Sequence, residues 1–205
     1  MGVYTGDNSA NTINLIGVPL GPGETGNSVS LLGGNDTFYG SSYTDIVTGG
    51  DGDDVLYGYG GGDILIGGNG VDQIHGGDGN DNLTGGAGND TIWGDLGNDV
   101  MSGNAGNDSY VHTAGSGVDT IAEDLNEAGT PGFGSGTDTL YYGANAADIG
   151  LYQSGNTLWV TTVADAADGI ISDGVQVQNF FSNTNSRIEY IVTADNYQLD
   201  LSSIV

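Results

Sequence analysis

A nine-residue repeat runs without a gap through the middle of the chain and constrains its fold more than any other feature. Seven consecutive blocks cover residues 49–111 and read GGDGDDVLY, GYGGGDILI, GGNGVDQIH, GGDGNDNLT, GGAGNDTIW, GDLGNDVMS and GNAGNDSYV. Upstream, residues 40–48 (GSSYTDIVT) keep the same frame, and residues 33–39 (GGNDTFY) form a shortened unit. Self-similarity at a fixed period indicates a solenoid, in which each repeat is one structural unit that stacks on its neighbours.

Two positions of the unit carry the regularity. The sixth is always aspartate: Asp36, Asp45, Asp54, Asp63, Asp72, Asp81, Asp90, Asp99 and Asp108. The eighth is always apolar: Phe38, Val47, Leu56, Leu65, Ile74, Leu83, Ile92, Met101 and Tyr110. Because glycines at the first, second and fourth positions permit a tight turn, positions seven to nine are expected to form a short strand whose middle side chain points inward. Two units then close one coil of 18 residues, and stacked coils bury the eighth-position side chains between two parallel sheets.

The same stacking predicts a metal site. Aspartates 18 residues apart lie above one another, with Asp36, Asp54, Asp72, Asp90 and Asp108 on one edge and Asp45, Asp63, Asp81 and Asp99 on the other. Carboxylates at strand spacing repel one another strongly unless cations lie between them. Carboxylate oxygens together with main-chain carbonyls form the all-oxygen shell that Ca²⁺ prefers, whereas Mg²⁺ keeps more of its water.

The charge balance excludes several classes of partner. The chain has 27 acidic residues and one basic residue, a formal net charge of −26, which argues against binding to nucleic acid or to anionic lipid. No apolar stretch is long enough to span a bilayer, and the first residues lack the basic and apolar segments of a cleavable signal peptide. Since 37% of the residues are hydrophobic, we expect a chain that folds once its negative charge is neutralised, not a disordered one.

The nonapeptides resemble the G-G-x-G-x-D-x-U-x repeats of the RTX (haemolysin-type calcium-binding) family, and the resemblance covers residues 33–111. It implies an all-β fold, a right-handed parallel β-roll (β-helix) with Ca²⁺ between successive turns on each edge. It also implies that the metal ligands are the sixth-position aspartates and the main-chain carbonyls of the first four turn positions. Those carbonyls belong to Gly49, Gly50, Asp51, Gly52, Gly67, Gly68, Asn69, Gly70, Gly76, Gly77, Asp78, Gly79, Gly85, Gly86, Ala87 and Gly88. The sequence departs from the pattern at the second turn position (Ser41, Tyr59, Asp95, Asn104) and at Tyr43 in the fourth.

The flanks divide the chain into four segments. Residues 1–32 are expected to form an N-terminal cap or degenerate repeat, 33–111 the roll, 112–142 degenerate repeats with an acidic loop, and 143–205 an antiparallel β cap. Asp119 and Asp138 keep the sixth position of displaced units and are further candidate ligands. The last segment contains LWVTTV, VQVQNFF and IEYIVTADNYQLDLSSI, which resemble the haemolysin-type calcium-binding-related module found after RTX repeats. Its apolar end after Asp200 resembles an uncleaved type I secretion signal.

No catalytic constellation is present in the sequence. The two histidines, His75 and His112, are not part of an H-E-x-x-H motif, G-x-S-x-G is absent, and there is no cysteine. Trp93 and Trp159 are interpreted as structural residues, with a ligand platform as the alternative, and His75 as a solvated side chain. We therefore expect a non-enzymatic, monomeric module that binds several Ca²⁺ ions and folds on binding them. The resemblance to the RTX family implies that it is extracellular and interacts with type I secretion machinery. The alternatives are the tail of a secreted enzyme (protease, lipase or alginate epimerase) and a calcium-stiffened adhesin or surface-layer segment.

Overall fold

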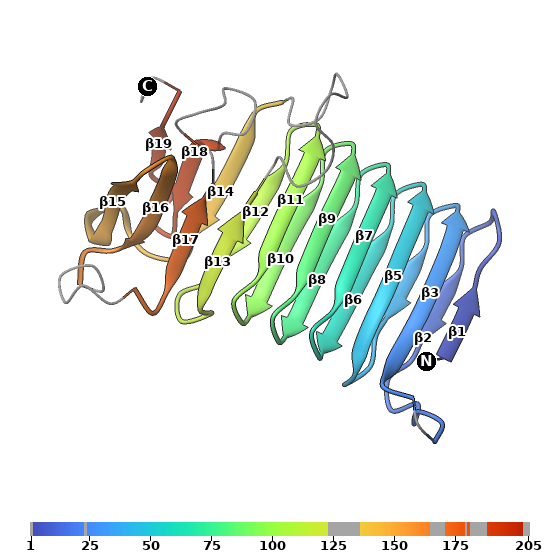
Figure 1. Ribbon diagram of the computed structural model, residues 1–205. Helices are drawn as coiled ribbons and strands as arrows, with labels where there is room; N and C mark the ends of the chain where they lie inside the picture. The colour runs from blue at the N-terminus through green and yellow to red at the C-terminus, as the bar shows by residue number, and fades with distance from the viewer. Residues whose placement is uncertain are drawn as a thin grey trace.

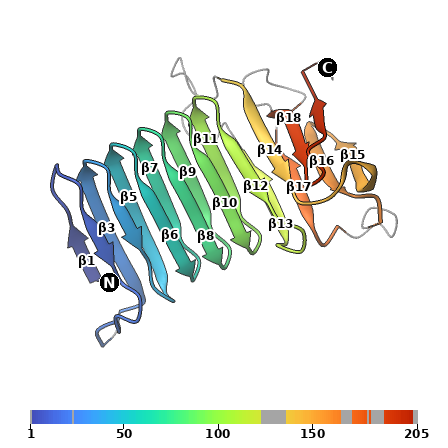
Figure 2. The same cartoon turned by 180° about the vertical axis from the view of Figure 1, so that it is seen from behind.

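The protein is a flattened roll of parallel β-strands (Figures 1 and 2). The computed structural model describes residues 2–22, 24–122, 136–164, 171–178, 180 and 188–202. The acidic loop predicted between residues 123 and 134 and the last three residues of the predicted secretion signal lie outside these ranges. The regular secondary structure of the described residues is almost entirely β-strand and includes the short 3-10 helix η1 (Ala146–Asp148).

Two sheets face each other across the roll. The first has ten strands, in spatial order β1 (Gly2–Thr5), β3 (Gly26–Gly33), β5 (Thr44–Asp51), β7 (Ile64–Asn69), β9 (Asn82–Ala87), β11 (Val100–Ala105), β13 (Val118–Ile121), β17 (Gly174–Val177), β16 (Thr157–Thr162) and β15 (Ile149–Ser154). The second has nine, in spatial order β19 (Gln198–Asp200), β18 (Ile188–Thr193), β14 (Asp138–Tyr142), β12 (Ser109–His112), β10 (Thr91–Leu96), β8 (Gln73–Asp78), β6 (Val55–Gly60), β4 (Thr37–Tyr39) and β2 (Thr12–Asn14).

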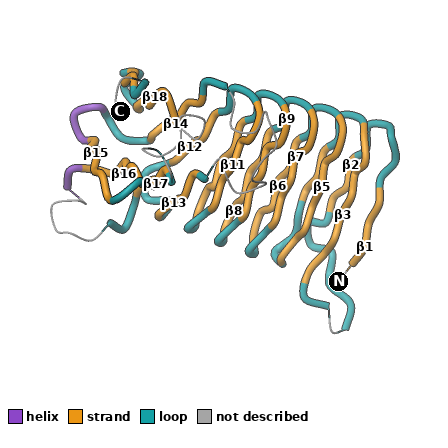
Figure 3. The backbone as a smooth tube through the Cα atoms, turned by 45° about the horizontal axis from the view of Figure 1, so that its top comes forward, coloured by secondary structure: helices purple, strands orange, loops and turns teal. Residues whose placement is uncertain are grey.

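The register confirms the 18-residue coil. Within the first sheet Leu65 pairs with Leu83, and within the second Leu56 pairs with Ile74, in both cases between parallel strands. From β1 to β14, successive strands of the chain alternate between the two sheets, so that each coil contributes one strand to each. The turns run along the two edges of the roll (Figure 3). The predicted parallel β-roll is therefore the observed architecture.

The eighth-position side chains form the core. All nine, from Phe38 to Tyr110, have no exposed surface, and they pack in one continuous cluster with the apolar residues of the flanking coils. Burying each of these side chains stabilises the fold by about 25 cal/mol for every Å² of apolar surface removed from water. Only one residue in nine belongs to this core, so the apolar surface buried per residue is small. Every ordered residue nevertheless costs backbone entropy, which the core has to offset.

The predicted length of the strands was wrong. We expected strands of three residues, whereas β6 to β11 each contain six, because the first three turn positions continue the strand and the second and third of them pair with neighbouring strands. In β7 and β9, for example, Gly68 pairs with Gly86 and Asn69 with Ala87. Only positions four to six form the turn, and position six is the aspartate.

The flanking segments extend the same two sheets. At the N-terminal end β1 pairs in parallel with β3 and β2 with β4. At the other end β17 pairs in parallel with β13 and β18 with β14. The antiparallel pairing expected of the cap is found between β15 and β16 and between β18 and β19. Within the described part of the chain, none of the helices has the length and apolar character needed to cross a membrane.

Candidate metal centre

The sixth-position aspartates form two buried rows, one on each edge of the roll. The first row contains Asp36, Asp54, Asp72, Asp90, Asp108 and Asp138, and the second contains Asp45, Asp63, Asp81, Asp99 and Asp119. None of these side chains is more than 3% exposed. The two candidates from displaced repeats, Asp119 and Asp138, are thus placed in the rows, although they follow their neighbours by 20 and 30 residues instead of 18.

One oxygen of each carboxylate is used to join neighbouring coils. The backbone N–H of Asp54 donates to Oδ1 of Asp72 at 2.8 Å, and the N–H of Asp72 donates to Oδ1 of Asp90 at 2.9 Å. The same bond recurs along both rows. Each aspartate therefore fixes the distance and orientation of the next coil with its Oδ1 atom.

The other oxygen has no partner in most of the rows. Within the described residues, Oδ2 is buried and without a hydrogen bond in Asp36, Asp54, Asp63, Asp72, Asp81, Asp90, Asp99 and Asp108. A buried carboxylate oxygen without a partner is strongly destabilising, and native structures hold few of them. Eight such atoms in two straight rows need a cation or a proton each.

The glycine at the first turn position makes room beside these oxygens. A methyl group on Gly67 would collide with Asp72 Oδ2 and with the carbonyl oxygen of Gly85 in the next coil. The same pair of groups meets at Gly49, where the atoms are Asp54 Oδ2 and the Gly67 carbonyl. A carboxylate oxygen and a main-chain oxygen from the adjacent coil therefore converge on one space that only glycine leaves open.

The rows provide oxygen ligands one carboxylate at a time. Among the described residues there is no cluster of three or more His, Asp or Glu side chains that could hold a metal ion. Each coil contributes one aspartate to each edge, so that an ion there also needs main-chain oxygens to complete its oxygen shell. Of the predicted carbonyl ligands, those at the third position already accept a hydrogen bond: the N–H of Gly52 donates to Asn69 O at 2.8 Å. One lone pair remains on each of those oxygens.

Burial makes the metal-free rows resist ionisation. Desolvation raises the pKa of Asp54, Asp72 and Asp108 to about 6. It raises the pKa of Asp63, Asp90 and Asp138 to about 7. The pKa values of Asp81 and Asp99 are also raised, again chiefly by burial and in part by neighbouring carboxylates. Without a cation, these groups favour the protonated form at a pH at which an exposed aspartate is ionised.

At the start of the second row, both carboxylate oxygens of Asp45 have hydrogen-bond partners within the protein. Oδ2 of Asp45 accepts the backbone N–H of Ser41 at 2.8 Å and lies 3.2 Å from its hydroxyl, and Oδ1 accepts Asn27 Nδ2 at 2.6 Å. This is the turn in which Ser41 and Tyr43 replace glycines. The departures from the repeat thus coincide with an aspartate whose two oxygens are already bonded.

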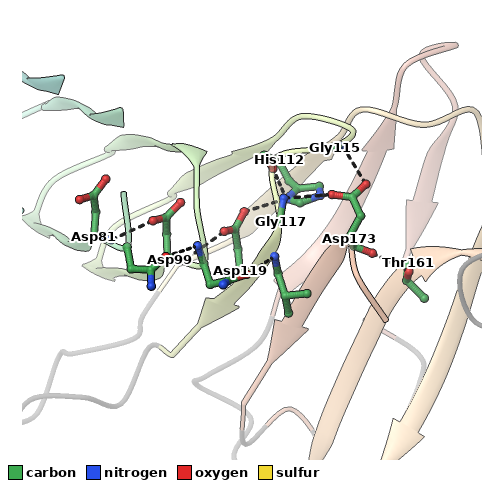
Figure 4. A network of polar contacts seen from close by, with 12 residues as sticks. Asp81, Asp99, His112, Gly115, Gly117, Asp119, Thr161 and Asp173 are labelled. Atoms are coloured by element: carbon green, nitrogen blue, oxygen red, sulfur yellow. Dashed lines mark hydrogen bonds and ion pairs between the residues drawn. The ribbon is translucent and has the colours of Figure 1, made fainter. Parts of the chain in front are cut away.

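The second row ends on a buried histidine (Figure 4). Nδ1 of His112 lies 2.7 Å from Asp119 Oδ2, and Nε2 lies 3.3 Å from Asp173 Oδ1. Gly115 N–H donates to the other oxygen of Asp173 at 2.9 Å. Because Asp119 Oδ1 also accepts the N–H of Asp99 at 3.1 Å, both oxygens of Asp119 have protein partners. In the first row, Asp138 N–H donates to Glu189 Oε2 at 2.7 Å, which continues the pattern with a glutamate.

Sequence reasoning missed the residues at the ends of the rows. Asn27 and Asn11 occupy the sixth position of degenerate N-terminal units, with Val29 and Ile13 two residues later, a signal that the spacing does contain. Glu189 and the His112–Asp173 contact carry no such signal, because the segments that bring them into place interrupt the period.

These features together define a calcium-binding parallel β-roll. Comparison with family models agrees: RTX calcium-binding nonapeptide repeats match residues 30–65, 39–74 and 75–110, and the haemolysin-type calcium binding protein related domain matches residues 167–203. The chain therefore contains an RTX calcium-binding repeat region followed by a haemolysin-type calcium-binding related domain, and it binds several Ca²⁺ ions. A search of curated proteins found no significant match to the chain.

Proposed function

We propose that calcium binding drives the folding of this roll outside the cell, after export by a type I secretion system. The observation that carries the proposal is the set of eight buried Oδ2 atoms without partners. These atoms, together with main-chain carbonyls of the first turn positions, are the proposed ligands on both edges. Asp45 and Asp119 are not among them, because their oxygens are bonded within the protein.

The physical basis is a balance between core and charge. The core alone is thin, and burying the ionised rows at neutral pH opposes folding. Ca²⁺ supplies positive charge where the carboxylates meet. Since eight of these aspartates both bond a neighbouring coil and offer a free oxygen, ordering one coil prepares the site of its neighbour. Binding and folding are therefore expected to be cooperative.

The proposed location follows from calcium availability and from the family. Extracellular calcium sites bind at ~10⁻⁴–10⁻³ M. A chain with such sites stays open in a calcium-poor cytosol and folds in calcium-rich surroundings. Proteins with RTX repeats are typically secreted, which supports the same compartment.

The proposal is tested by far-UV circular dichroism of the full chain. With excess chelator at pH 7.5 the β-sheet signal is expected to be lost, and Ca²⁺ is expected to restore it with a sigmoidal dependence, while Mg²⁺ at the same concentration does not. An unchanged spectrum in chelator, or equal recovery with Mg²⁺, contradicts calcium-driven folding.

A further inference from the structure

The outer face of the second sheet carries a row of stacked rings. It is formed by the ninth-position residues Tyr39, Tyr57, His75 and Trp93 of β4, β6, β8 and β10. Neighbouring ring centroids lie 5.4, 4.9 and 4.1 Å apart, with planes within 17° of parallel. His75, expected to be a solvated side chain, is partly buried between Tyr57 and Trp93. The calcium rows do not use any of these rings.

The stack is interrupted at one position. On β12 the residue that pairs with Trp93 is Val111, and the residue that pairs with Val111 on β14 is Tyr141. A valine thus separates two aromatic residues. The surface is hollowed there, and the hollow, which we call the slot, measures about 520 Å³ and is lined by Gln73, Thr91, Trp93, Ser109, Val111 and Tyr141.

Along the stack, the gap between Trp93 and Tyr141 has the width of one missing ring. Trp93 and Tyr141 are two strand spacings apart, roughly 9.6 Å. A ring inserted midway would lie roughly 4.8 Å from each, within the range of favourable ring contacts. This equals the spacing within the existing stack, where the centroids lie 4.1 to 5.4 Å apart. The face of Trp93 opposite His75 is the side turned toward the slot.

The charges around the slot select an uncharged guest. The chain carries a net charge of −26, which repels anions. None of the residues that line the slot is acidic, so that a cation held there would have no carboxylate beside it. The rim consists instead of the amide of Gln73 and the hydroxyls of Thr91 and Ser109, which donate and accept hydrogen bonds.

We propose that the slot binds one pyranose ring of an uncharged saccharide. The C–H faces of such a ring would pack against Trp93 and Tyr141, and its hydroxyl edge would bond to the polar rim, the combination of apolar walls and few polar groups typical of small-molecule sites. Val111 forms the floor. This binding activity goes beyond calcium-driven folding and depends on it only in that calcium keeps the strands in register.

The experiment is isothermal titration of the calcium-loaded full chain with cellohexaose, chitohexaose, mannohexaose and xylohexaose. At least one is expected to bind, and the substitution Val111→Tyr, which fills the slot with a ring, is expected to weaken that binding at least tenfold. Trp93→Ala is expected to do the same. Tyr39→Ala, an equivalent substitution at the far end of the stack, is the matched control and is expected to leave affinity within twofold. Calcium-dependent circular dichroism of each variant shows whether the roll has folded, which separates this test from that of folding.

Several results would overturn the proposal. The first is that the folded chain binds none of the four saccharides. The second is that the folded Val111→Tyr variant binds the saccharide with the same affinity as the wild type. The third is that hexagalacturonate or hexalysine binds more tightly than any uncharged hexamer. The first two show that the slot is not a saccharide site, and the third shows that its guest is charged.

Discussion

Replacing Asp72 by asparagine is expected to have opposite effects on the calcium-free and the calcium-loaded roll. Asp72 lies in the middle of the first row, has no exposed surface, and is bonded to the coils on both sides. The amide in Asp72→Asn keeps the oxygen that accepts the N–H of Asp54. It replaces the unpartnered Oδ2, the proposed calcium ligand, by a neutral NH₂ group.

The magnitude in the absence of calcium follows from the pKa. Burial raises the pKa of Asp72 from its ordinary 3.8 to about 6. The folded state therefore binds more protons than the unfolded state between these values, and stability falls as the pH rises from 3.8 to 6. Above pH 6 the ionised side chain costs about 3 kcal/mol, at about 1.4 kcal/mol for each pKa unit. Asp72→Asn removes this cost, so the calcium-free variant gains up to about 3 kcal/mol over the wild type between pH 4 and pH 7.

In the presence of calcium the same change removes a charged ligand. Perturbing the surroundings of a metal typically costs 10- to 100-fold in affinity, so the calcium midpoint of the variant is expected to rise by at least about tenfold. Asp36→Asn is expected to raise the calcium midpoint less, because the neighbour of Asp36 on one side is Asn11, which has no carboxylate to share an ion with it.

The assay follows the folded fraction by circular dichroism, in chelator from pH 4 to 7.5 and then during a calcium titration at pH 7.5. If Asp72→Asn shows the same pH dependence as the wild type in chelator, Asp72 does not titrate as a buried group. A calcium midpoint that stays equal to that of the wild type would show that Asp72 is not a ligand.

Three further predictions concern the sites and their protonation. Gly67→Ala is expected to raise the calcium midpoint by at least about tenfold, because a methyl group would fill the space beside Asp72 Oδ2. The control is Gly60→Ala, whose methyl group would meet no atom closer than 3.8 Å. Equal midpoints for the two variants would contradict the proposed geometry of the site. In the second row, Asp63→Asn is expected to raise the calcium midpoint clearly more than Asp45→Asn, and the reverse order in the same titration would show that Asp45 is a ligand. Calcium affinity measured by isothermal titration is expected to fall as the pH is lowered from 7.5 to 5, because protons compete with Ca²⁺ for carboxyl groups whose pKa is raised. A constant affinity would exclude side-chain carboxylates as the main ligands.

The period of the sequence was enough to predict the coil, the core and most of the two rows. This works because the repeat specifies a local unit, and a solenoid stacks each unit on the next one of its own kind. The aspartate and apolar positions therefore keep their roles from Asp36 to Tyr110. Strand length was mispredicted because glycine-rich positions have no strand propensity of their own, and their pairing is imposed by the neighbouring coil.

The ends of the rows could not be predicted in the same way. Asp119 and Asp138 follow insertions, and only the fold shows that the chain returns to the same edge after them. The contact between His112 and Asp173 joins residues 61 positions apart and depends on the docking of β17. The ring stack itself could be predicted, because the aromatic residues recur at the ninth position of every second repeat. The slot could not, because it requires Tyr141 on β14 to lie beyond Val111 on β12, which only the sheet order shows.

The most direct test of the account is an anomalous difference map from crystals of the full chain grown in Ca²⁺. We expect two lines of peaks along the edges of the roll, each about 2.3–2.6 Å from an Oδ2 atom of Asp36, Asp54, Asp63, Asp72, Asp81, Asp90, Asp99 or Asp108. No peak is expected at Asp45 or Asp119. Peaks away from these oxygens, or a roll that crystallises in chelator at neutral pH with the same structure and no ions, would contradict the claim that the aspartate rows hold the calcium.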